Sequence, residues 1–207
     1  VKDIAEVTPH PERVLGLHYF FHPAKNRLVE IIGHEQTSPD AFDAAWAAQE
    51  ALGKTPIRSA DAPGFVVNRY FVPWLNEAVR LLEEGVADIA AIEWAAKKAF
   101  NISMGPFELM NVTGVPIAMH AAKTLGAELG PFYAPVASLV NQVETVKENW
   151  LLDGEPQEDK YSAVAEPLLG VTFYVATKLV GEGVATIEDT DIGARVGLRW
   201  GKGPFQL

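Results

Sequence analysis

The chain has 207 residues, of which 48% are hydrophobic and 21% are charged, enough to form one large or two small packed cores. Its 17 Lys and Arg residues against 27 Asp and Glu residues give a net charge of -10, which repels phosphate backbones and anionic lipids. We therefore expect no nucleic-acid partner and no membrane contact. The absence of cysteine excludes a disulfide framework and thiolate catalysis, and it fits a cytoplasmic location.

Residues 1–62 alternate between strand and helix patterns. Two short apolar runs, 14–21 and 28–32, are typical of buried strands, and each contains one ionisable residue. A Ser-Pro-Asp helix start at 38–40 precedes an Ala-rich helix that stops at Gly53, and 55–59 forms a third strand. The order predicts the C-terminal end of an α/β sheet.

Residues 63–152 carry helical periodicity only. Apolar residues from Phe71 to Leu82 recur at helical spacing before Gly85, and Asp88 can cap a second helix that reaches Phe100. A further amphipathic helix fits 116–125, and the polar stretch 153–160 is typical of a linker. The chain opens without Met and stops after a Gly-Pro pair, and we expect it to be a fragment of a longer protein.

The helical part contains an internal repeat at an offset of 98 residues. Segment 84–89 matches 182–187, and the pentapeptide at 105–109 matches 203–207. Without a gap, 10 of the 27 aligned positions from 83 to 109 are identical. Two matches at one offset predict a duplicated all-α domain, with copy one at 63–152 and a truncated copy two at 153–207.

The two ionisable residues inside the strand runs are His18 and Glu30. A carboxylate buried on a strand needs a partner, and an imidazole held by a carboxylate at one nitrogen can act as a general base through the other. The alternative from periodicity alone is an edge strand with both side chains in water. A shared metal at His18 and His22 is not expected, because four residues on a strand span roughly 13 Å.

A dinucleotide fingerprint would identify a cofactor from the sequence. The nearest glycine pattern, 181–186, ends in Thr and follows a helical segment rather than a strand, so it indicates a helix stop. These residues therefore predict no loop that cradles phosphates.

Over 1–115 the chain resembles the L-3-hydroxyacyl-CoA dehydrogenase family. The strings that carry the likeness are Pro11–Phe20, Leu28–Ile31, Gly53–Lys54, Asp61–Arg69 and Met104–Leu109. The resemblance implies a mainly α chain, in which the end of a Rossmann-type NAD-binding domain at 1–62 precedes a duplicated helical domain of the 6-phosphogluconate dehydrogenase type. It also implies that the glycine fingerprint lies upstream of Val1 and that the cofactor is NAD.

The resemblance assigns roles to individual residues. It places the catalytic base on His18, its carboxylate partner on Glu30 and a substrate-holding amide on Asn68. The family's His-Phe-Phe-Asn-Pro string is altered here, because Phe21 stands where Asn is usual. Lys25 and Arg27 could face CoA phosphates, or could lie in a solvated loop.

The positions 98 beyond 64–69 keep neither the Asn nor the Arg of that segment, so copy two is expected to have no site of its own. The family resemblance implies that copy two covers the surface through which single-copy members pair. We therefore expect a monomer or a homodimer formed through the helical domain, with a fused enoyl-CoA hydratase domain as a possible partner.

The predicted reaction is NAD-dependent oxidation of an L-3-hydroxyacyl-CoA to the 3-oxoacyl-CoA in fatty acid β-oxidation or a related acyl-CoA pathway, with the fragment inactive alone. Two alternatives stay open. One is a non-catalytic module that binds acyl-CoA or mediates assembly, and the other is an NAD-dependent dehydrogenase of a free β-hydroxy acid.

Overall fold

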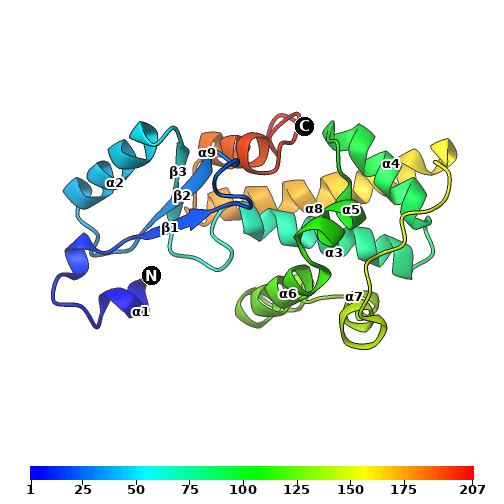
Figure 1. Ribbon diagram of the computed structural model, residues 1–207, viewed down its shortest axis with the longest axis horizontal. Helices are drawn as coiled ribbons and strands as arrows, with labels where there is room; N and C mark the ends of the chain where they lie inside the picture. Colours follow the sequence, from blue (N-terminus) through cyan, green and yellow to red (C-terminus); the bar gives the residue numbers. More distant parts are fainter.

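The computed structural model describes residues 1–207, and most of them are helical (Figure 1). A three-stranded sheet lies near the N-terminus, and the remaining elements are helices. The strands are β1 Gly16–Tyr19, β2 Leu28–Gly33 and β3 Thr55–Ala60. The helices are α1 Lys2–Ala5, α2 Pro39–Ala51, α3 Val67–Glu83, α4 Ile89–Phe100, α5 Pro106–Thr113, α6 Val115–Leu129, α7 Ala137–Asn141, α8 Tyr161–Gly181 and α9 Ile187–Ile192. Short 3-10 or π-helical turns lie at Pro11–Arg13, Pro131–Tyr133, Gln142–Val146, Glu158–Lys160 and Gly193–Gly197.

The sheet has the strand order β1-β2-β3, with β1 antiparallel to β2 and β2 parallel to β3. The register sets His18 directly opposite Glu30. Opposite residues of an antiparallel pair point to the same face of the sheet with their Cβ atoms close together. β2 is almost entirely buried because α2 and the helical part of the chain cover it, so Glu30 has no access to bulk water.

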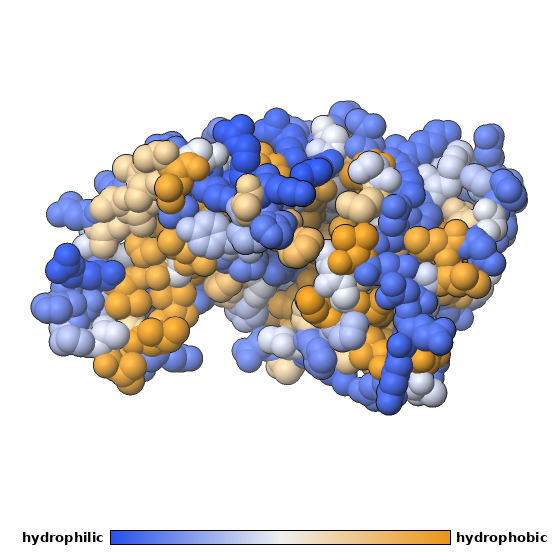
Figure 2. All heavy atoms as spheres, in the orientation of Figure 1, coloured by the Kyte–Doolittle hydropathy of each residue, from blue (hydrophilic) through white to orange (hydrophobic).

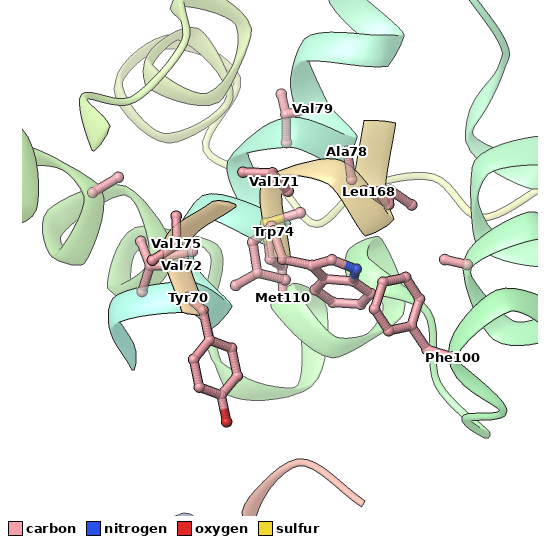
Figure 3. Close-up of a cluster of buried hydrophobic side chains, with 14 of the residues drawn as sticks. Tyr70, Val72, Trp74, Ala78, Val79, Phe100, Met110, Leu168, Val171 and Val175 are labelled. Atoms are coloured by element: carbon pink, nitrogen blue, oxygen red, sulfur yellow. The ribbon is translucent and has the colours of Figure 1, made fainter. Parts of the chain in front are cut away.

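The helical part is built around α3 and α8, which lie side by side along the long axis of the molecule (Figure 1). Apolar side chains from both helices meet α4 and α5 in one core, in which Trp74 packs edge to face against Phe100 at 5.5 Å between ring centroids (Figure 3). The Trp200 ring packs against Phe100 at a tilt, with 4.6 Å between the ring centroids. The C-terminal segment therefore belongs to the core of the preceding helices.

The predicted elements correspond to those of the structure. All three predicted strands are present, α2 begins at the Ser38 cap, and α4 begins at Asp88, whose carboxylate accepts from the N–H of Ala91. The predicted linker is irregular from 151 to 157 and ends in a 3-10 turn. The glycine pattern at 181–186 is the end of α8, with Gly183 at φ 72°.

The segment Glu158–Gly181, which contains α8, is long and apolar enough to cross a membrane by length and composition alone. The core helices of soluble proteins meet the same criterion, so the observation is weak evidence for a span. One face of α8 packs against α3 and α4, and the other face is exposed and includes Tyr174.

Candidate active site

His18 and Glu30 form a hydrogen-bonded pair between β1 and β2. His18 Nδ1 lies 2.5 Å from Glu30 Oε2, and the Glu30 carboxylate is 0% exposed while the imidazole is 30% exposed. A carboxylate can only accept, so Nδ1 carries the proton and the Nε2 lone pair is free. The imidazole thereby has one fixed nitrogen and one that can take a proton.

The second Glu30 oxygen closes the N-terminus of α3. Oε1 accepts from the backbone N–H groups of Val66 at 3.1 Å and Val67 at 2.8 Å. Val66 is the N-cap of α3 and offers no side-chain acceptor, so a carboxylate from another element satisfies donors that the helix leaves open. The positive end of the helix dipole favours the charged form of that carboxylate. Glu30 therefore joins the sheet, the helix and the imidazole in one hydrogen-bond network.

The turn that precedes α3 and places its N-terminus beside Glu30 depends on a glycine. Gly64 has φ +76°, and a Cβ there would meet the Arg69 backbone at 3.1 Å and Leu125 at 3.0 Å. The next residue, Phe65, is also left-handed at φ 47°, and its ring lies 5.5 Å from the His18 ring. Phe20, which directly follows β1, packs edge to face on the imidazole, with 4.8 Å between the ring centroids. Two aromatic rings thus restrict the rotation of His18 and its contact with water.

Asn68 lies in the first turn of α3, directly after the two residues whose N–H groups bind Glu30. Its half-buried side chain makes no hydrogen bond within the chain, so the amide is free for a ligand. The structure therefore brings Asn68 to the helix end that Glu30 caps.

Lys25 and Arg27 lie in the connection between β1 and β2, and both side chains are exposed. Arg27 Nε donates to the carbonyl of Gly53 at 3.2 Å, and neither residue contacts the dyad. Lys54 holds this connection in place, because its ammonium donates to the carbonyls of Pro23 and of Asn26, the latter at 2.8 Å. Sequence reasoning gave Lys54 no role, and only the tertiary contacts reveal it.

A buried tyrosine lies next to the dyad. Burial, followed by the negative charges of Glu30 and Asp191, raises the pKa of Tyr70 well above its ordinary value. Its hydroxyl is 3.4 Å from the carbonyl of Thr190. Tyr70 is therefore a neutral, buried hydroxyl that donates to this carbonyl.

A cavity of about 650 Å³ opens at a different place, between α2, the ends of β2 and β3 and the turn after α8. Its lining includes His34, Arg58 and Thr186 but no residue of the dyad. The dyad is thus separate from this cavity. On the face shown in Figure 2, apolar side chains gather over α1 and β1. The exposed large apolar residues of these two elements are Ile4, Leu17 and Tyr19.

The fold and the site together define a class of protein, in which the end of an α/β domain is joined to a helical domain and a His–carboxylate pair lies at the junction. Comparison with known families agrees with this class. Residues 1–62 match the model for the NAD binding domain of 3-hydroxyacyl-CoA dehydrogenase, and residues 64–149 match the model for its C-terminal domain. The chain belongs to the 3-hydroxyacyl-CoA dehydrogenase family.

Individual relatives cover the chain in part. It is 35% identical over 130 residues to 3-hydroxybutyryl-CoA dehydrogenase of Clostridioides difficile, which is 63% of this chain and 46% of the relative. It is 40% identical over 138 residues to the fatty acid oxidation complex subunit alpha of Shewanella loihica, which is 66% of this chain and 19% of that protein. The chain therefore spans less than half of either relative.

Solved structures extend the comparison. (S)-3-hydroxybutyryl-CoA dehydrogenase of Ralstonia eutropha is 34% identical with a TM-score of 0.67, over 69% of this chain and 51% of that one. 3-Hydroxybutyryl-CoA dehydrogenase of Escherichia coli matches 99% of this chain and 65% of that one with a TM-score of 0.87. The latter identity is 19%, so this likeness concerns the fold alone.

Proposed function

We propose that the protein containing this chain oxidises the 3-hydroxyl of an L-3-hydroxyacyl-CoA to a ketone, with NAD as the hydride acceptor, in fatty acid oxidation or a related acyl-CoA pathway. The observation that carries the proposal is the hydrogen-bonded chain from His18 through Glu30 to the N-terminus of α3. Relatives named as 3-hydroxybutyryl-CoA dehydrogenases support the substrate class.

The residues of this chain act on the proton. The free Nε2 of His18 removes the hydroxyl proton as the C–H bond at carbon 3 breaks and the oxygen forms a carbonyl. NAD, when bound, supplies the acceptor for the hydride that leaves carbon 3. The imidazolium that forms keeps its Nδ1–H bond to Glu30, whose negative charge stabilises it. In the reverse reaction the same Nε2 returns the proton.

Asn68 is the proposed substrate-orienting residue. Its free amide lies at the same helix end as the Glu30 contacts and can bind the substrate oxygen beside the imidazole. Lys25 and Arg27 are proposed to meet the CoA phosphates, a role that their exposed cationic side chains permit.

Residues 1–207 do not supply a dinucleotide cradle. The glycine pattern 181–186 ends a helix, and no glycine-rich turn joins a strand to a helix in the sheet. The outer edge of β1 has no partner strand, so the sheet offers an edge at which an α/β domain can continue. The present residues therefore fit the proton-transfer half of the reaction, and we propose that this chain alone is inactive.

We also propose three structural units: 1–62, helical copy one at 63–152 and copy two at 153–207. Equivalent capping bonds at an offset of 98 support the duplication. Asp88 and Thr186 each accept from the N–H three residues later, at 2.8 and 3.0 Å. Glu93 and Asp191 each accept from the N–H 14 residues later, at 2.6 and 2.8 Å. Capping bonds of this kind depend on backbone geometry, so their recurrence favours a shared ancestry of the two units.

Two kinds of partner are proposed for this chain: a second copy of itself and a fused domain. α8 packs against α3 and α4 and covers one side of copy one, which supports a monomer, or a homodimer that uses another helical surface. A fused enoyl-CoA hydratase domain is proposed because the Shewanella relative, a subunit of a fatty acid oxidation complex, is much longer than this chain. Sedimentation of the natural protein tests whether it is a monomer or a homodimer. The cytoplasmic location stays a prediction, which cell fractionation would test.

The test of function uses the natural protein with everything that precedes Val1 and follows Leu207. NADH oxidation with acetoacetyl-CoA is measured for the wild type, His18→Gln and His120→Gln, in which an exposed histidine on α6 receives the same change. We expect turnover in the wild type and the control and its collapse in His18→Gln. Equal turnover in all three would favour a different base, and no turnover would favour the non-catalytic acyl-CoA-binding module. Activity with the free acid but not the thioester would favour the β-hydroxy acid alternative.

A further inference from the structure

Arg69 is the third residue of α3 and is almost completely buried, with 2% of its side chain exposed. A cation in the first turn of a helix opposes the helix dipole, and a buried guanidinium needs a charged partner. Nothing in copy one provides that partner, and the Arg69 Nε has no hydrogen bond at all. The ion pair that compensates this charge therefore comes from elsewhere in the chain.

The partner is Glu182, 113 residues further along the chain, at the end of α8. Its carboxylate binds the Arg69 NH2 group and is 38% exposed, so the pair extends from the buried guanidinium to solvent. The following turn is fixed as well, because the carbonyl of Val184 accepts from the N–H of Ala60 at 2.8 Å, at the end of β3. The end of α8 is thus attached to both the sheet and α3.

Glu182 binds the first turn of α3, and the same turn contains Asn68 and a backbone N–H group that binds Glu30. Arg69 follows Asn68 directly, and Val67, two residues earlier, donates to Glu30. A movement of this turn would change the position of the Asn68 amide and the two hydrogen bonds that orient Glu30 against His18. We infer that Glu182, in the second helical unit, is a positioning residue for the dyad and Asn68, acting through its ion pair with Arg69.

Other residues of the segment that follows α8 pack against the start of α3 and the connection after β1. A Cβ on Gly193 would lie 2.7 Å from the Val67 side chain, so the π-helical turn packs closely against the start of α3. The amide of Asn26, in the connection that follows His18, donates to the carbonyl of Gly197 at 2.9 Å. Segment 182–197 therefore contacts both the start of α3 and the connection after β1, although none of its residues touches the dyad.

This inference rests on the proposed dehydrogenase function, and the experiment separates the two. Wild type and His18→Gln are assayed first in the natural full-length protein, since their result tests the function alone. Glu182→Gln is then compared with Glu166→Gln, which makes the same change at an exposed, unpaired glutamate of α8. A misplacement of about 1 Å in a site can cost on the order of 100-fold. We expect kcat of Glu182→Gln to fall about 10- to 100-fold, with the KM for NADH and the kcat of Glu166→Gln unchanged.

A double variant distinguishes positioning from general stabilisation. In Arg69→Met combined with Glu182→Met, both charges are removed, and we expect kcat to recover above that of Glu182→Gln because no buried cation is left without a partner. The double variant also keeps the inference testable where Glu182→Gln fails to fold. The inference is overturned if Glu182→Gln lowers the melting temperature while kcat and KM match the Glu166→Gln control, or if the double variant is folded and no more active than Glu182→Gln.

Discussion

Replacing Glu30 by glutamine tests the tautomer argument without removing the cap of α3. The Gln oxygen can still accept from the N–H groups of Val66 and Val67, at the present distances of 3.1 and 2.8 Å. Its NH2 group then faces His18 Nδ1, which must accept instead of donate. The imidazole proton moves to Nε2, and the nitrogen that should take the substrate proton is blocked.

The size of the effect follows from this geometry. The corresponding carboxylate-to-amide change in a Ser–His–Asp triad costs on the order of 10⁴ in kcat for the same reason. That factor equals about 5 kcal/mol in the activation free energy. Stability should change little, because every donor around the side chain keeps an acceptor or gains one. We expect the free energy of unfolding of Glu30→Gln to lie within about 2 kcal/mol of the wild type.

The assay combines steady-state turnover with acetoacetyl-CoA and NADH and urea unfolding of the same samples. Glu30→Ala is the contrasting variant, since it leaves two buried backbone N–H groups unpaired at about 1–3 kcal/mol each. We expect Gln to be folded and inactive and Ala to be destabilised as well. A folded Glu30→Gln protein with kcat within tenfold of the wild type would refute the reasoning that Glu30 sets the tautomer of His18.

Further predictions concern stability and can be checked by urea unfolding. Glu93→Ala removes the carboxylate that accepts from three backbone N–H groups at the start of α5, so we expect a loss of roughly 2–4 kcal/mol, against no loss for the exposed Glu128→Ala. The pKa of Tyr70 is raised above its unfolded value of about 10, so the stability that the neutral hydroxyl contributes is complete below that pH and is lost as the pH rises. Above pH 10, Tyr70→Phe should therefore lose less stability than the wild type. Parallel plots of unfolding free energy against pH for the two proteins would contradict this. Gly193→Ala places a Cβ 2.7 Å from Val67 in a packed region, so we expect a destabilisation of about 1–3 kcal/mol, and an unchanged midpoint would show that the turn can move.

Local signals in the chain were sufficient to predict many of the elements. Ser38 and Asp88 each accept from the N–H three residues later, as their positions before Ala-rich segments predict. The strand pattern predicted β1 and β2, and a carboxylate inside an apolar run predicted that Glu30 needs a partner. The sequence did not decide between water and His18 as that partner, because the register of two strands depends on contacts between them.

Other features of the site had no local signal. The cap of α3 is a carboxylate 37 residues before Val67, and the partner of Arg69 lies 113 residues beyond it. The chain gives no indication that these groups meet, since neither spacing corresponds to a helix turn or a strand pair. Lys54 likewise acts through carbonyl groups that any sequence would supply.

The sequence by itself determined the apolar strands, the starts of α2 and α4 and the family resemblance, because these depend on side-chain periodicity and on capping residues close in the chain. Tertiary structure decided which nitrogen of His18 is free, what closes the N-terminus of α3 and how Glu182, at the end of α8, reaches Arg69. The physical reason is that buried charges and open helix donors must be satisfied in space. Many distant groups could do so, and the packing of α3, α8 and the sheet selects the ones that do.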